Sequence, residues 1–165
     1  MLADKKNFTP LAIADYISAL PIAFTFYMGY NTLKEFNKFY LLGFAGLFAS
    51  SLIADFIKRL PYLKKWESFT VRPEGANNWD LLSKNDYSDK INPPGFPSGH
   101  MTTVTFFSSY ILFGSETNNL EKLSLNGLII ITAWARYFKR VHNIPQILAG
   151  ILLGLFMGGI FVKLN

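Results

Sequence analysis

Three long apolar segments limit most strongly how this chain can fold. They cover residues 10–30, 39–57 and 145–162. A helix needs roughly 20 residues to cross a hydrocarbon core of about 30 Å, or slightly fewer where the bilayer thins locally. Half of the 165 residues are hydrophobic and 16% are charged, and the mean hydropathy is +0.22. The sequence therefore predicts an all-α integral membrane protein with a single domain over residues 1–165.

Two shorter apolar segments, residues 101–114 and 123–135, are marginal in length for a membrane span. A short helix that is buried among neighbours can still cross, with its Thr and Ser side chains facing other helices. Counting both segments predicts a polytopic transmembrane helix bundle of about five spans. The first long segment holds Asp15 and Pro21 and lacks a convincing cleavage site, so we expect a retained helix rather than a signal peptide.

The charge and the cysteine count exclude several kinds of partner and site. The formal net charge is +5, but no Lys- and Arg-rich tract stands apart from the ends of the apolar segments. A nucleic-acid partner is therefore not expected. The chain has no cysteine, which excludes disulfides and thiolate metal sites. The expected partners are the bilayer and a substrate, and the oligomeric state is left open.

Five alternating spans would bring most of the cationic residues to one side of the membrane. That side holds the N-terminus, the 58–97 loop and the 136–144 link. It carries both histidines and twelve of the 16 Lys and Arg residues, and the other side carries four. The positive-inside rule therefore predicts that this side is cytoplasmic. The twelve cations are Lys5, Lys6, Lys58, Arg59, Lys64, Lys65, Arg72, Lys84, Lys90, Arg136, Lys139 and Arg140.

The stretch PGFPSGHMTTVTFF, which begins at Pro94, marks the start of one of the shorter helices. Pro97 restricts the residue before it, and Ser98 is a strong N-cap candidate for the apolar run from Met101. His100 is then expected in the first helical turn. A helix N-terminus presents free N–H groups and the positive end of the helix dipole, which together favour an anion such as phosphate.

Cationic and histidine side chains from three segments meet the needs of phosphoryl transfer. A phosphomonoester dianion needs several convergent donors, for which Arg offers bidentate contacts and Lys a point charge. Two histidines from different segments can supply a nucleophile and a proton donor for the leaving group. The residues are Lys65 and Arg72 in KWESFTVRP, Ser98, Gly99 and His100 in PSGH, and Arg136, His142 and Gln146 in ARYFKRVHNIPQILAG.

These segments resemble the three signature motifs of the type 2 phosphatidic acid phosphatase (PAP2) superfamily, K-x6-RP, PSGH and SR-x5-H-x3-D. The first two match completely. In the third, Arg136 and His142 have the family spacing, but Ala135 replaces Ser and Gln146 replaces Asp. The resemblance covers residues 65–150 and implies a helix bundle of the PAP2 / haloperoxidase-like type. The family usually has six helices, so one N-terminal helix is missing by this count.

The resemblance implies metal-independent hydrolysis of a lipid phosphate monoester or diphosphate, phosphatidate-like or polyprenyl diphosphate-like, with no cofactor. His142 is then the nucleophile that becomes a phosphohistidine, and His100 is the general acid and later the base for water. We expect the long loop that contains RPEGANNWDLL to lie over the site. The phosphate-binding residues that the resemblance implies are Lys65, Arg72, Ser98, Gly99 and Arg136.

Gln146 departs from the family pattern at the residue that orients the nucleophile. Gln can accept the Nδ1–H of a histidine through its carbonyl oxygen, but it brings no negative charge to stabilise an imidazolium. The sequence thus predicts either reduced activity, which Gln146→Asp should raise, or a carboxylate from elsewhere, with Asp55, Glu67 and Glu74 as candidates. The alternative is a catalytically weakened PAP2-like membrane protein with a structural or lipid-binding role.

Glycine and aspartate residues inside the apolar segments are candidates for helix packing as well as for function. Gly150, Gly154 and Gly158 recur at four-residue intervals, which predicts close helix packing within the bundle. Asp15 and Asp55 lie inside or at the edge of spans, where an ionisable group is a functional candidate. A helix-packing or interface role is an equal alternative for both.

Overall fold

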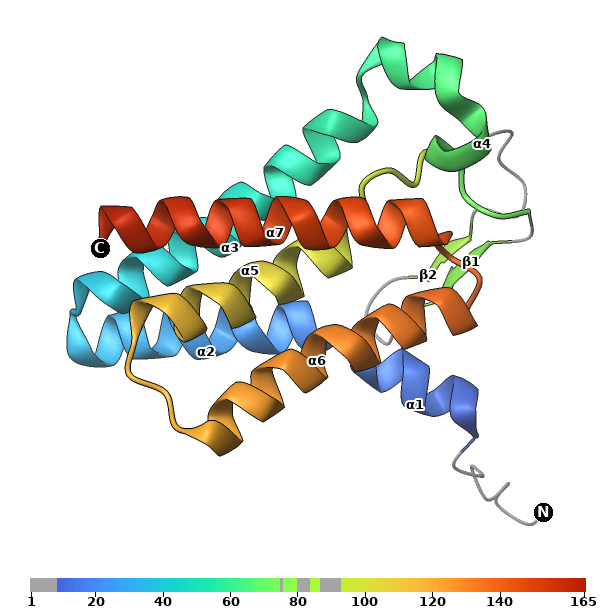
Figure 1. Cartoon of the computed structure of the whole chain (residues 1–165). Coiled ribbons are helices and arrows are strands. Elements are labelled where there is room, and N and C mark those ends of the chain that lie inside the picture. The colour runs from blue at the N-terminus through green and yellow to red at the C-terminus, as the bar shows by residue number, and fades with distance from the viewer. Residues whose placement is uncertain (1–8, 75, 80–83, 87–92) are drawn as a thin grey trace.

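The protein forms a bundle of helices (Figure 1). The computed structural model describes residues 9–74, 76–79, 84–86 and 93–165. In these residues one short antiparallel hairpin accompanies the helices, and the prediction of an all-α membrane bundle is confirmed. The elements are α1 (Pro10–Ile17), α2 (Leu20–Glu35), α3 (Lys38–Lys58), η1 (Pro61–Trp66, a 3-10 helix), α4 (Glu67–Thr70), β1 (Asn77–Trp79), β2 (Lys84–Asp86), α5 (Gly99–Gly114), α6 (Asn119–Phe138) and α7 (Ile144–Leu164).

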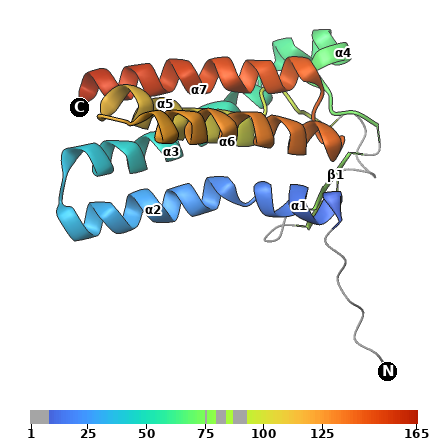
Figure 2. The same cartoon turned by 60° about the horizontal axis from the view of Figure 1, so that its bottom comes forward.

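The first apolar segment forms two helices instead of one. α1 ends at Ile17 and α2 begins at Leu20. Pro21, in the first turn of α2, has no N–H, and in a continuous helix its ring would collide with the carbonyl of residue 17. At the break, the Ser18 hydroxyl donates to the Ala14 carbonyl (2.8 Å). α1 and α2 consequently lie end to end along one side of the bundle (Figure 2).

Three helical stretches in the described residues are long and apolar enough to cross a membrane. They are Pro10–Glu35, Lys38–Lys58 and Ile144–Leu164, and they coincide with the three long apolar segments of the sequence. α5 and α6 contain the two shorter segments. Neither is both long enough and apolar enough to count as a candidate membrane span. The count of five spans therefore stays a prediction.

α5 lies at the centre of the bundle, which explains how a helix of 16 residues fits there. Every residue from Met101 to Tyr110 is buried, and α7, α3 and α6 pack against it. Two of its hydroxyls bond back to their own helix: Thr102 donates to the Ser98 carbonyl (3.0 Å) and Thr103 to the Gly99 carbonyl (3.0 Å). Such local bonds let a buried helix carry hydroxyl side chains without a partner helix.

The glycine repeat of α7 faces α5, as the sequence predicts. A Cβ on Gly150 would lie 2.6 Å from the Ser98 carbonyl oxygen, and one on Gly154 would lie 2.6 Å from the Thr102 carbonyl oxygen. Both distances are too short for any side chain larger than hydrogen. The close approach sets the first turns of α5 and α7 side by side, where the Ser98 N–H donates to the Gln146 carbonyl (3.0 Å).

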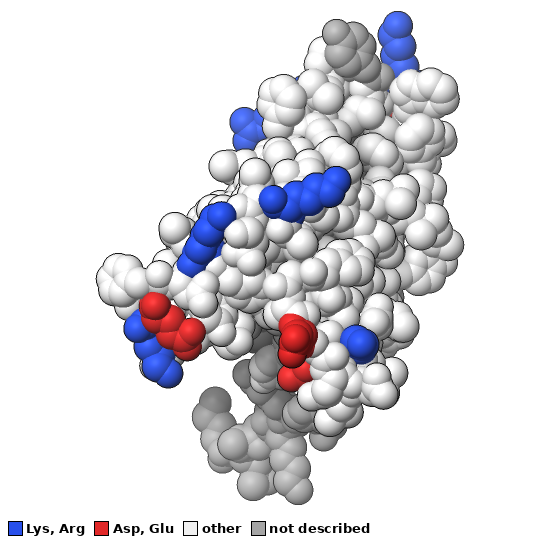
Figure 3. Space-filling view, turned by 60° about the vertical axis from the view of Figure 1, so that its left-hand side comes forward, with Lys and Arg blue, Asp and Glu red and all other residues white. Residues whose placement is uncertain are grey.

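One end of the bundle collects the three segments that carry the predicted motifs. The starts of α5 and α7, the end of α6 and the β1–β2 hairpin lie at this end, and the C-terminus and the α2–α3 link lie at the other (Figure 1, Figure 2). Figure 3 shows a mostly uncharged face with a few scattered Lys, Arg, Asp and Glu side chains. A surface of this kind suits contact with lipid.

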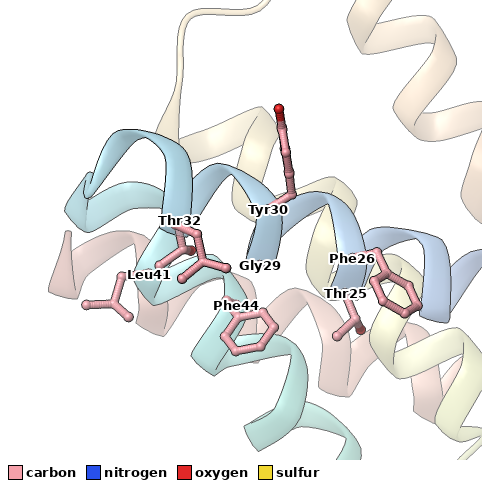
Figure 4. Close-up of a pocket in the computed structure, with 8 residues that line it drawn as sticks. Thr25, Phe26, Gly29, Tyr30, Thr32, Leu41 and Phe44 are labelled. Atoms are coloured by element: carbon pink, nitrogen blue, oxygen red, sulfur yellow. The ribbon is translucent and has the colours of Figure 1, made fainter.

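A groove of about 480 Å³ lies between α2 and α3 (Figure 4). It opens where Gly29 leaves space beside the ring of Phe44, which would be 3.0 Å from a Cβ at that position. The hydroxyls of Thr25 and Thr32 donate to carbonyls of their own helix, Pro21 and Met28 (both 2.8 Å). The groove therefore presents an apolar surface, as expected of helices that face lipid.

Candidate functional site

Helix α5 has no side-chain cap at its N-terminus. Ser98 occupies the predicted N-cap position, with extended backbone angles (φ −69°, ψ 112°), but its side chain makes no capping hydrogen bond. The Ser98 hydroxyl is fully buried, and among the described residues it has no hydrogen-bond partner. A buried hydroxyl without a partner is energetically unfavourable, so this atom is suited to a ligand that would supply the missing bond.

Arg72 ties the three motif segments together. It follows α4, and its backbone N–H donates to the Pro93 carbonyl (3.0 Å). Its Nε donates to the Pro94 carbonyl (3.1 Å) and its Nη1 to the Val141 carbonyl (2.9 Å). These bonds hold the guanidinium, which is 8% exposed, against the loop before α5 and the link before α7.

His142 lies in the link between α6 and α7, and its ring is buried between Gln146 and Arg72. Its Nδ1 is 2.9 Å from Gln146 Oε1, and its Nε2 is 3.5 Å from Arg72 Nη1. The local fold places Gln146 there through a capping box at the start of α7. In that box the Asn143 side chain accepts the Gln146 N–H (3.1 Å), and Gln146 Oε1 accepts the Asn143 N–H (3.3 Å).

Only one orientation of the Gln146 amide satisfies its neighbours. Its Nε2 donates to the carbonyls of Phe69 (3.1 Å) and Val71 (2.6 Å). In the reversed orientation the amide oxygen would face these two carbonyl oxygens, and the NH2 group would face the Asn143 N–H. The oxygen is therefore the atom that faces His142, which fixes the proton of the imidazole on Nδ1 and leaves the lone pair on Nε2.

His142 stays neutral because of its surroundings. Burial lowers its pKa well below the ordinary value of 6.5, and the charges of Arg72, Arg136 and His100 lower it further. The hydrogen bond to Gln146 acts in the opposite direction and is the weaker influence. A neutral imidazole with its lone pair on Nε2 is the form that a nucleophile needs.

Arg136 is fully buried at the end of α6, and a residue outside the motifs holds it. Its Nη1 donates to the hydroxyl of Ser18 (2.9 Å), at the break between α1 and α2. Close by, Lys139 forms an ion pair with Asp15 (2.7 Å). Both contacts hold the region of α1 and Ser18 against the end of α6, which is consistent with the packing role that was one of the two alternatives for Asp15.

The other predicted residues are placed as follows. Gly99 and His100 begin α5, beside Ser98, and the charge of His100 acts on His142. Lys65 lies on η1 with its side chain exposed, and in the described part of the chain it makes no hydrogen bond or ion pair. The structure thus brings together seven of the eight predicted residues, and no contact among the described residues joins Lys65 to them.

None of the three carboxylates considered as substitutes takes the place of Gln146 beside His142. Asp55 pairs with Lys58 (2.7 Å), and the side chains of Glu67 and Glu74 are exposed. Among the described residues no group of three or more His, Cys, Asp and Glu side chains is arranged to hold a metal ion. The loop expected over the site includes residues 75, 80–83 and 87–92, which lie outside the described residues.

A cavity of about 680 Å³ opens beside the site. Its wall combines the polar link around His142 with aromatic side chains from the last turns of α6, among which Trp134 and Phe138 are stacked (centroids 5.1 Å apart). Such a wall suits a molecule with one polar and one apolar end. The lining residues are Pro73, Trp134, Tyr137, Phe138, Arg140, His142 and Asn143.

Comparison with known proteins identifies one family. Residues 39–165 match the model of the PAP2 superfamily, a range that runs from α3 to the C-terminus and includes every predicted site residue. Ser18 and Asp15 lie before it. No curated protein and no solved structure matches the chain.

Proposed function

The chain belongs to the PAP2 superfamily, and on that premise we propose that it hydrolyses a lipid phosphate monoester or diphosphate through a phosphohistidine intermediate. Membership in the family supports phosphatase-type activity in general. The observation that carries the finer proposal is the geometry of His142. Its Nδ1 faces Gln146 Oε1 (2.9 Å), and its Nε2 faces the Arg72 guanidinium (3.5 Å).

In the proposed reaction, the Nε2 lone pair of His142 attacks phosphorus in line with the bond to the leaving oxygen. A P–N bond forms as that P–O bond breaks, and His100 donates its proton to the leaving oxygen. Water then attacks the phosphohistidine, with His100 as the base, and the P–N bond breaks. This second step releases inorganic phosphate and restores both histidines.

Three features support the binding of a phosphoryl group beside His142. Arg72 and Arg136 are buried within electrostatic range of its ring. The Ser98 hydroxyl is buried with no partner, and the first N–H groups of α5 lie next to it. Convergent cations of this kind stabilise the charge that develops on the transferring phosphoryl group. By its motif, Lys65 is also proposed to bind phosphate.

A lipid is the proposed substrate because the site lies where an apolar bundle ends. The aromatic cavity beside His142 offers a surface for an acyl or prenyl chain, and the apolar helices support membrane association. Phosphatidate-like and polyprenyl diphosphate-like lipids both have the required phosphate and tail.

The decisive experiment measures phosphate release from phosphatidate by the purified chain in detergent, with excess EDTA present. We expect turnover that EDTA does not change, because the cations of the site perform the charge stabilisation that a metal would otherwise give. The His142→Ala variant, purified in the same way, serves as a matched control for contaminating phosphatases. Activity that EDTA abolishes and Mg²⁺ restores would contradict the proposed mechanism.

Gln146 favours a second candidate, a PAP2-like membrane protein with a structural or lipid-binding role and weakened turnover. The amide lacks the negative charge that the family motif supplies at this position. This alternative is preferred if the chain binds lipid phosphates but releases phosphate from none of them.

We further propose that the chain is a multi-pass protein whose site lies on the cytoplasmic face. The support is the excess of Lys and Arg, twelve against four, on the side to which the predicted five-span topology assigns the site. Tags at the N-terminus and in the α2–α3 link, tested for protease access in sealed vesicles, are expected to report opposite sides. An N-terminal tag on the lumenal or external side would overturn the assigned orientation.

A further inference from the structure

Lys58, which belongs to none of the three motifs, lies at the phosphate site. It is the last residue of α3, and its side chain is only 16% exposed. Its Nζ is 3.3 Å from the position that a Cβ on Gly99 would occupy. The ammonium group therefore lies against the first turn of α5, where Ser98 and His100 flank Gly99.

An ammonium group in this place is electrostatically unfavourable without an anion. The first turn of α5 presents N–H groups and the positive end of the helix dipole. The charges of Arg72 and Arg136 also repel Lys58. Asp55 compensates in part through its ion pair (2.7 Å), but the Asp55 side chain is 56% exposed and lies on the solvent side, so its attraction is weakened by screening.

The Ser98 hydroxyl is an independent sign that this place binds an anion. It is fully buried and unpartnered, although the neighbouring hydroxyls of Thr102 and Thr103 bond to their own helix. A phosphoryl group at the start of α5 could accept from this hydroxyl and from the Lys58 ammonium together. Gly99 leaves room for a phosphoryl group to approach, because a Cβ at this position would lie 3.3 Å from Lys58 Nζ.

We infer that Lys58 is a phosphate-binding residue that acts beside the buried cations Arg72 and Arg136. This inference rests on the proposed function and deepens it. In the family pattern a lysine fills this role seven residues before Arg72, at Lys65, but that side chain is exposed on η1. In this chain the end of a long helix brings a second ammonium group to the site, in addition to the one that the motif assigns to Lys65.

The test compares Lys58→Met and Lys58→Arg with Arg59→Gln, a matched control that removes a charge from the same end of α3 where the side chain is exposed. The probe is orthovanadate, which mimics the five-coordinate phosphorus of the transition state. We expect Lys58→Met to raise the vanadate inhibition constant about 10- to 100-fold and to lower kcat/KM by a similar factor. Lys58→Arg should recover most of the loss, and Arg59→Gln should stay within about twofold of the parent.

Vanadate inhibition of Lys58→Met equal to that of the parent would overturn the inference and leave the proposed function intact. A parent chain that neither releases phosphate nor binds vanadate would overturn both. If Lys58→Met does not fold, labelling of the parent protein by a small amine-reactive reagent replaces it. Vanadate should then protect Lys58 but not Lys122, which is exposed near the start of α6. Equal labelling of Lys58 with and without vanadate counts against the inference.

Discussion

Replacing His142 by Ala is expected to lower kcat for phosphate release by a factor of about 10⁴ or more, because the substitution removes the proposed nucleophile. The phosphate-binding groups Arg72, Arg136 and Ser98 remain, so we expect the affinity for inorganic phosphate to change far less than kcat. Vanadate should bind more weakly, because its five-coordinate form takes the His142 nitrogen as a ligand. The measurement is steady-state phosphate release in detergent, together with trapping of an acid-labile phosphoryl adduct in the parent protein. An adduct on His100 or Ser98 would contradict the assignment.

His100→Ala is the matched comparison, since it separates the nucleophile from the proton donor. A leaving group of low basicity, such as p-nitrophenolate, needs little protonation. We therefore expect the loss in His100→Ala to shrink markedly on p-nitrophenyl phosphate, whereas the loss in His142→Ala should persist. If the good leaving group restores His142→Ala instead, the two roles are reversed.

The environment of His142 also gives its prediction a pH dependence. Burial, with Arg72 and Arg136 nearby, holds the pKa of His142 well below its ordinary value. Loss of the nucleophile by protonation should therefore begin at a pH below about 6.5, the ordinary value for histidine. As the pH falls through about 6.5, the unfolded chain binds a proton at this residue that the folded chain does not, and stability declines.

This decline can be assigned to His142 by comparing thermal denaturation midpoints in detergent at pH 5 and pH 7.5. The parent protein is expected to lose more stability on acidification than His142→Ala, which has no imidazole to protonate at this position. Equal losses in the two proteins would show that the buried imidazole does not resist protonation.

Local sequence patterns were sufficient to predict the long helices and to show which segments meet at one end of the bundle. Pro94 to His100 combine helix-stopping prolines with an N-cap serine, so the start of α5 could be placed from the sequence alone. The spacing of Arg136 and His142 likewise predicted their shared position, because the intervening link is short. The glycine repeat of α7 predicted close packing, which its approach to α5 confirms.

Long-range contacts account for the residues that the sequence could not identify. Ser18 and Arg136 are far apart in the chain, and nothing in the residues around Ser18 indicates that its hydroxyl accepts from a guanidinium. Lys58 resembles any basic residue at the end of a membrane helix, and only the packing of α3 against α5 shows that it lies beside Gly99. Pro21 is a local signal for the break between α1 and α2. It does not indicate that Ser18, at this break, binds Arg136.

The consequence of Gln146 also depended on contacts from a distant segment. The motif alone indicates only that the Gln146 amide replaces a carboxylate and lacks its negative charge. It does not indicate whether the amide oxygen or the NH2 group faces the histidine. The carbonyls of Phe69 and Val71 decide the matter, because they require a donor. These carbonyls come from α4 and the residue after it, so the position of the first motif determines the tautomer of His142.

Gln146→Glu is accordingly expected to destabilise the protein, although the family motif has an acid at this position. One oxygen of the new carboxylate could still accept from His142 Nδ1. The other would replace the NH2 group and face the carbonyl oxygens of Phe69 and Val71 in a fully buried place. Two hydrogen bonds would be exchanged for repulsion, at a cost of about 2–4 kcal/mol, or a fall of roughly 5–15 °C in the denaturation midpoint.

The cost should depend on pH in a defined direction. Where the pH is low enough to protonate the new carboxyl, it can still donate to one of the two carbonyls, and the variant should lie close to the parent. At pH 8 the ionised group has no proton to donate, and the deficit relative to the parent should be largest. Gln146→Asp is one methylene too short to span both contacts, and Gln146→Met keeps the length without hydrogen bonds, so both should be less stable than the parent at either pH.

Turnover decides between the motif and the observed contacts. A carboxylate that stabilised the imidazolium of His142 would need to contribute about 1.4 kcal/mol in the transition state for a tenfold gain. The expected loss of hydrogen bonding is larger than that gain, and Gly95, where an added Cβ would lie 2.5 Å from Gln146 Oε1, packs directly against this side chain. We therefore expect Gln146→Asp and Gln146→Glu to lower kcat at pH 8 by about tenfold, the reverse of the outcome that the motif predicts. Faster turnover by either acid, with undiminished stability at pH 8, would mean that a donor other than this amide satisfies Phe69 and Val71, and that the chain is a PAP2 enzyme impaired only by a missing charge.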